Sequence, residues 1–94
     1  MDTIYTVDYF IEKFSAIPLE RWVTHDIGRD GNHCAFGHCG LIFDKDSKTW
    51  QATEESRQLQ LLFGDDKVTI INDKAIKYGN NPKDRILNKL KSLK

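Results

Sequence analysis

The stretch His33-Cys34-Ala35-Phe36-Gly37-His38-Cys39-Gly40 holds both cysteines of the 94-residue chain, two of its three histidines and two of its six glycines. Cysteine and histidine at this density are typical of metal, redox or nucleophilic sites. Small residues at this density also allow a helix to pack closely against a neighbour. Residues 33–41 include no β-branched side chain, so the stretch is predicted to be a helix capped by Asn32, with a strand as the alternative.

Three further helices are predicted where a capping residue precedes apolar residues at helical spacing. The first follows Thr6, the second follows Thr53 and ends at Gly64, and the third begins at Asn81-Pro82. A short helical turn is expected to begin at Pro18.

The best strand candidate is residues 67–72, Lys-Val-Thr-Ile-Ile-Asn, because this segment is rich in β-branched residues. A lone strand needs a partner, which is either a short strand within residues 41–50 or the same strand of a second copy. We therefore predict one small α+β domain over residues 1–94, with three to four helices and a short β element. A mainly helical domain is the alternative.

The size and composition of the chain exclude several classes of protein. At 94 residues it is one small domain with a thin margin of stability, and oligomerisation would bury more surface. No apolar run reaches the roughly 20 residues of a membrane helix, and residues 1–5 lack the features of a signal peptide. Two cysteines without such a signal indicate a reducing cytosol and free thiols. We expect a cytoplasmic protein with no cofactor that forms a homo-oligomer, most simply a dimer.

Charge is balanced overall but unevenly distributed along the chain. Residues 1–66 contain 12 acidic and 6 basic residues, a balance of −6, whereas residues 67–94 contain 2 acidic and 8 basic residues, a balance of +6. A basic region of this kind attracts phosphate groups or nucleic acid, but a lysine-rich helix face is commonly just solvated. We do not expect nucleic-acid binding.

Within the Cys/His stretch, Cys34 and His38 lie four residues apart and would share one face of a helix. Two more ligands would complete a zinc site, and the candidates are His25, Asp26, His33 and Cys39. No second closely spaced Cys or His pair accompanies them, although structural zinc sites usually have one. We therefore predict structural thiols and imidazoles and no metal; if a metal binds, Cys34 and His38 are the expected ligands.

A cysteine nucleophile is the other chemical interpretation of this stretch. Cys34 would sit just after the helix cap, in the first turn, where the pKa of a thiol is lowered. His25 or His33 would act as its base, oriented by Asp26 or Asp30. The chain is short for both a deep pocket and a cover over the substrate, so we predict that the protein is not an enzyme.

Four segments of the chain carry a family resemblance: Tyr5-Thr6-Val7-Asp8-Tyr9-Phe10-Ile11, Ile17-Pro18-Leu19-Glu20-Arg21-Trp22, Cys34-Ala35-Phe36-Gly37-His38-Cys39-Gly40 and Pro82-Lys83-Asp84-Arg85-Ile86-Leu87. They resemble a group of small proteins encoded by bacteriophages and prophage-bearing bacteria. The resemblance implies a phage accessory protein made inside a bacterium. Such proteins often bind or block a host component, including the nucleotide signals of antiphage defence. The resemblance assigns no catalytic residue.

Non-covalent binding of a nucleotide-like ligand requires flat aromatic rings, arginines for phosphate and free N–H groups at a helix start. We predict six ligand-binding residues: Arg21, Trp22, Trp50, Arg57, Tyr78 and Arg85. Arg21 and Arg85 are the main candidates, because one stands beside Trp22 and the other lies in the first turn of the last helix. The alternative is that the tryptophans are core residues and the arginines are solvated.

The residues and the resemblance together predict a non-enzymatic phage accessory protein that sequesters a small nucleotide-derived signal. The alternatives are a protein-binding inhibitor of a host enzyme and a small Cys/His zinc-binding protein. In each case the expected setting is the cytoplasm of the bacterial host.

Overall fold

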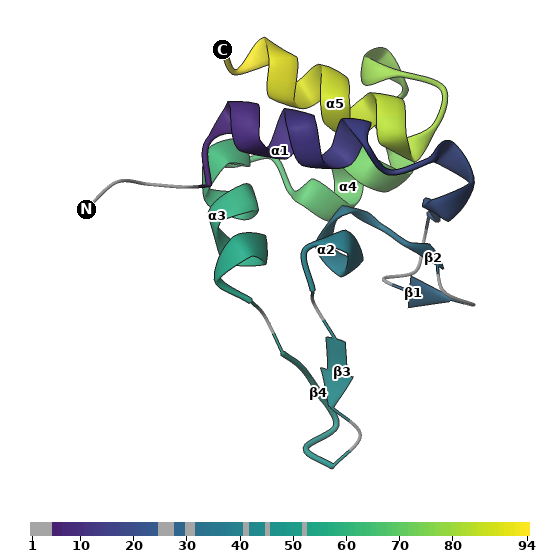
Figure 1. Cartoon of the computed structure of the whole chain (residues 1–94), viewed down its shortest axis with the longest axis vertical. Helices are drawn as coiled ribbons and strands as arrows, with labels where there is room; N and C mark the ends of the chain where they lie inside the picture. The colour runs from purple at the N-terminus through teal and green to yellow at the C-terminus, as the bar shows by residue number, and fades with distance from the viewer. Residues whose placement is uncertain (1–4, 25–27, 30–31, 41, 45, 52) are drawn as a thin grey trace.

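The computed structural model describes residues 5–24, 28–29, 32–40, 42–44, 46–51 and 53–94. Helices form most of this part of the chain: α1 (Val7–Ser15), α2 (Ala35–His38), α3 (Glu54–Phe63), α4 (Val68–Lys74), α5 (Pro82–Ser92) and the 3-10 helices η1 (Leu19–Arg21) and η2 (Ile76–Tyr78). The strands are β1 (Gly28–Arg29), β2 (Asn32–His33), β3 (Ile42–Asp44) and β4 (Thr49–Gln51). Helices α1 and α5 lie side by side, α4 packs against α5, and the β3–β4 hairpin projects away from the helices (Figure 1).

The three helices predicted from their caps are confirmed. The side chain of Thr6 accepts a hydrogen bond from the backbone N–H of Tyr9, and Thr53 forms a reciprocal capping box with Ser56. Asn81 caps α5 by accepting from the backbone N–H of Asp84, with Pro82 at the first helical position. These caps act within three residues, so the sequence alone is sufficient to place them.

The prediction of an α+β fold is wrong, because the molecule is mainly helical. Residues 67–72, expected to be a strand, form α4, in which Val68, Ile71 and Asn72 are buried and Ile70 is exposed. That burial pattern has helical spacing, whereas a strand would bury alternate residues. Packing against α5 therefore overrides the β propensity of the segment, as tertiary context often does.

The described strands form only two separate antiparallel pairs, β1 with β2 and β3 with β4. In the β3–β4 hairpin the register places Phe43 opposite Trp50. Because residues 67–72 are helical, they offer no strand to a second copy. Strand pairing between these segments therefore no longer supports the predicted dimer. Association of the chain remains a prediction.

Helix α2 is much shorter than expected, and its cap is a different residue. It begins at Ala35, so Cys34 and not Asn32 is the N-cap, and the side chain of Cys34 makes no capping hydrogen bond. The cap comes instead from α4: Oδ1 of Asn72 accepts from the backbone N–H of Ala35 at 3.2 Å. A buried polar side chain thus joins two elements that are distant in the sequence.

The core lies where these helices meet. Its buried residues are Phe10, Phe14, Trp22, Ala35, Cys39, Leu59, Phe63, Val68, Ile71, Ile86, Leu87 and Leu90. Both cysteines are free and buried, as predicted for structural thiols.

The base of the β3–β4 hairpin is held where α2 ends and α3 begins. The hydroxyl of Thr53 donates to the backbone carbonyl of Cys39. Gly40 adopts a φ of +88°, and a Cβ added there would lie 3.1 Å from Cγ2 of Thr53. This backbone conformation and close approach give a physical reason for glycine at position 40.

Candidate functional site

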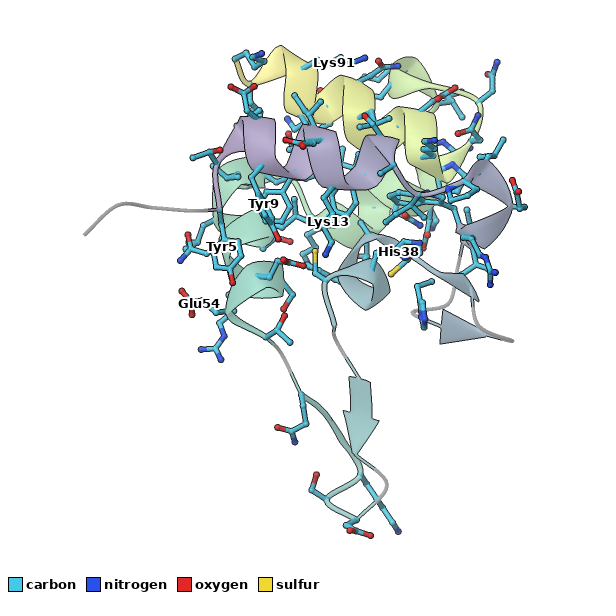
Figure 2. The ribbon with its side chains drawn as sticks, viewed as in Figure 1. Tyr5, Tyr9, Lys13, His38, Glu54 and Lys91 are labelled. Carbon is cyan, nitrogen blue, oxygen red and sulfur yellow. The ribbon has the colours of Figure 1, made fainter. Side chains whose placement is uncertain are left out.

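Two groups of polar side chains involve the α2 region (Figure 2). The first, called here the Glu55 cluster, consists of Tyr9, Lys13, Cys39 and Glu55. The second, called the His38 cluster, consists of Trp22, His33 and His38.

Glu55 is the centre of the first cluster. Its Oε1 lies 2.8 Å from the ammonium of Lys13, and its Oε2 accepts a hydrogen bond from the phenol of Tyr9. The thiol of Cys39 lies near enough to this carboxylate for each group to shift the pKa of the other. Only 15% of the Glu55 side chain is exposed, against 29% of the Lys13 side chain, so the ion pair is largely sheltered from water.

Local structure explains how these groups come together. Tyr9 and Lys13 are four residues apart on α1 and therefore lie on one side of that helix. Glu55 is in the first turn of α3, where the helix dipole favours a carboxylate and the Thr53–Ser56 capping box fixes the backbone. Figure 2 shows Tyr9 and Lys13 between α1 and the helices α2 and α3.

The cluster holds Glu55 charged and the two weaker acids neutral. Burial alone raises the pKa of Glu55, but the hydrogen bonds from Lys13 and Tyr9 outweigh it, so this pKa lies below its usual value. The hydrogen bond to Glu55 raises the pKa of Tyr9 to about 12. Burial and the nearby carboxylate of Glu55 raise the pKa of Cys39 far above its usual value. Cys39 is therefore a poor nucleophile.

An open hollow of about 410 Å³ adjoins the Glu55 cluster. It is lined by Tyr9, Glu12, Lys13 and Ala16, which form one stripe along α1. Its volume is at the lower end of the range for small-molecule sites. The wall combines an aromatic ring, a carboxylate, an ammonium and a methyl group.

The His38 cluster packs against the core. The ring of His38 lies 4.7 Å from that of Trp22 and 5.4 Å from that of His33, measured between centroids. Its Nε2 is buried and has no hydrogen-bond partner among the described residues. Burial, and then the neighbouring His33, lower the pKa of His38 to about 4. His38 is thus a neutral, structural imidazole at neutral pH.

The geometry does not support the zinc-binding alternative. In the part of the chain that the structure describes, no group of three or more His, Cys, Asp or Glu side chains is placed to hold a metal ion. The predicted pair of Cys34 and His38 therefore has no third described ligand. His25 and Asp26, two of the suggested additional ligands, lie outside the described residues.

The structure also does not support Cys34 as a nucleophile. Cys34 is the N-cap of α2 and is only 3% exposed. Burial raises its pKa although backbone N–H groups of Gly37 and Phe36 act in the opposite direction. The expectation of a low thiol pKa after a helix cap is therefore wrong. Of the suggested bases and orienting residues, only His33 lies within the described residues.

Arg85, a main candidate for phosphate binding, donates hydrogen bonds to backbone carbonyls within the protein. Only 9% of it is exposed. Its Nη1 donates to the carbonyl of Asn72 at 2.9 Å, and its Nε donates to the carbonyl of Gly79 at 3.2 Å. The first turn of α5 also has an anionic group of its own, because the carboxylate of Asp84 lies 3.0 Å from Nδ2 of Asn81. The N-terminus of α5 therefore already carries its own anion.

The other predicted ligand-binding residues do not form one site. Trp22 is buried, contacts Phe14 and His38, and donates from Nε1 to the carbonyl of Ile17 at 3.4 Å, so it is a core residue and not a stacking surface. Tyr78 is half-buried, with the ammonium groups of Lys77 and Lys89 at 5.1 Å and 5.6 Å from its ring. The two remaining arginines are exposed on separate elements, Arg21 on η1 and Arg57 on α3. Trp50 lies in β4, and its side chain is outside the described part.

The sequence analysis missed the residues that the structure does bring together. Tyr9, Glu12, Lys13 and Ala16 repeat at intervals of three and four residues, which was a visible signal of a shared helix face. Glu55 is 46 residues away from Tyr9, and that contact has no signal in a single sequence.

Among the described residues, no helix has the length and apolar character required to cross a bilayer. No protein-family model, no curated protein and no solved structure matches the chain.

Proposed function

We propose that this chain is a non-catalytic phage accessory protein that binds and sequesters a small nucleotide-derived signal, and that the hollow on α1 is its binding site. The phage setting rests on the sequence resemblance. The observation that carries the proposed site is the hollow of about 410 Å³ lined by Tyr9, Glu12, Lys13 and Ala16.

The chemistry of the lining suits such a ligand. Among the described residues the ammonium of Lys13 is paired with Glu55, and an ammonium has three N–H donors, so donors remain for a phosphate oxygen. The ring of Tyr9 offers a flat surface for a base. The exposed carboxylate of Glu12 is an acceptor for the N–H groups of a base. Phosphate, ring and N–H groups occur together in a nucleotide.

Binding is favoured over catalysis because the candidate nucleophiles are suppressed. The pKa values of both Cys34 and Cys39 are raised by burial, and the hydrogen bond to Glu55 raises that of Tyr9. A nucleophile at neutral pH requires the opposite shift or a strong adjacent base, and Glu55, the carboxylate beside Tyr9, has a lowered pKa and is a weak base. Sequestration needs only affinity, which the hollow can supply.

The test is calorimetric titration of the full chain with adenosine 5′-monophosphate, ADP-ribose and a panel of cyclic dinucleotides. We expect at least one to bind, and we expect Lys13→Met to weaken that binding by about tenfold or more, since a charge-assisted hydrogen bond contributes roughly 1.5–3 kcal/mol. Lys91→Met is the matched control, because Lys91 is an exposed lysine on α5. Absence of binding with every nucleotide, or equal loss in both variants, would contradict the proposal.

A protein-binding inhibitor of a host enzyme is the second candidate, and the β3–β4 hairpin favours it. The hairpin projects from the helices (Figure 1), and a two-stranded hairpin is marginally stable on its own. A third strand from another protein would stabilise it by edge pairing. Heat denaturation of protein purified from its host separates the two candidates. Sequestration predicts release of an intact small molecule, whereas inhibition predicts a bound host protein that is lost when proline is introduced into β3.

A further inference from the structure

We infer that the ligand's anionic group binds in the hollow by drawing Lys13 away from Glu55, so that Glu55 is an internal competitor that sets the affinity of the site. This inference rests on the proposed function and deepens it. The predicted ligand class is a flat ring joined to a single phosphate group.

The side chain of Lys13 both lines the hollow and contacts Oε1 of Glu55 at 2.8 Å. An incoming anion therefore meets an ammonium whose charge is already compensated by a carboxylate. The anion must compete with Glu55 for hydrogen bonds from a single cation, and this competition weakens binding.

Glu55 keeps another hydrogen-bond donor when Lys13 moves. The phenol of Tyr9 donates a hydrogen bond to its Oε2. Its place in the first turn of α3 further favours a carboxylate. Glu55 is therefore not left as an isolated buried charge, so the lysine is free to turn toward the hollow.

The charges around the hollow also restrict the number of phosphate groups on the ligand. Glu12 and Glu55 together carry two negative charges near the hollow, against the one positive charge of Lys13. A ligand with several phosphate groups is repelled by this arrangement. Among adenine nucleotides we therefore expect adenosine 5′-monophosphate to bind more tightly than adenosine 5′-triphosphate.

The test compares adenosine 5′-monophosphate with adenosine, which lacks the phosphate. The measured quantity is the ratio of their affinities, followed by NMR titration at millimolar ligand. In Glu55→Gln the competing charge is removed while an oxygen acceptor remains for Tyr9, and we expect the ratio to rise about threefold to fivefold, the scale of a partly exposed ion pair. Glu54→Gln removes the same charge from the neighbouring residue, whose contact is with Gln58, and should leave the ratio unchanged.

A second variant should change the affinity ratio in the opposite direction. It keeps the inference testable if the first variant does not fold. Tyr9→Phe keeps the ring but removes one donor to Glu55, so Glu55 holds Lys13 more strongly and the ratio should fall. Binding of adenosine 5′-monophosphate with the same ratio in the wild type and both variants would overturn the inference and leave the proposed function intact. No binding of either probe or of any nucleotide in the panel would overturn both.

Discussion

Replacement of Asn72 by alanine is the sharpest test of how this fold is held together. The side chain of Asn72 is fully buried. Its Oδ1 accepts from the backbone N–H of Ala35 at 3.2 Å, and its Nδ2 donates to the carbonyl of Val23 at 3.0 Å. Alanine would leave both backbone groups without these partners, the N–H of Ala35 in the interior and the carbonyl of Val23 partly buried.

The expected loss of stability follows from those two groups. A buried polar group without a partner costs about 1–3 kcal/mol, so the pair predicts a loss of roughly 2–5 kcal/mol, allowing for partial relaxation. A domain of this size has about 5–15 kcal/mol in total. The change should therefore lower the melting temperature by about 8–40 °C, at about 4–8 °C for each kcal/mol.

Urea unfolding followed by tryptophan fluorescence measures this loss, because Trp22 is buried. Asn80→Ala is the matched control, since Asn80 is exposed just before α5 and should change stability by less than about 0.5 kcal/mol. The slope of the free energy against urea should stay unchanged in both variants. If Asn72→Ala costs no more than Asn80→Ala, the buried asparagine does not join α2 to α4 as argued.

Two further predictions concern titratable groups. The pKa of His38 is lowered to about 4 in the folded state from an ordinary value of 6.5, so the unfolded chain binds more protons between these values and stability should fall as the pH drops from 7 to 5. Urea midpoints at the two pH values measure the fall, which His38→Gln should reduce. Cys34 and Cys39 are buried with raised pKa values, so a thiol reagent at pH 8 should label them only after unfolding. Rapid labelling of the native protein would show that the thiols are accessible.

Local sequence determined where the main helices begin. Thr6, Thr53 and Asn81 each cap a helix through a hydrogen bond that spans three residues. The apolar residues that follow each cap repeat at helical spacing, and among them Phe10, Leu59 and Ile86 lie in the core. A signal confined to a few neighbouring residues is fully present in the sequence.

Tertiary structure alone decided the state of residues 67–72 and the candidate site. A β-branched segment forms α4 because helical spacing buries Val68 and Ile71, and packing outweighs intrinsic propensity. The pairing of Lys13 with Glu55 depends on how α1 meets α3, and the internal role of Arg85 depends on carbonyls of residues 72 and 79. Residue type indicates what a side chain is able to bind, whereas only the three-dimensional arrangement decides which partner it meets and whether it remains available for a ligand.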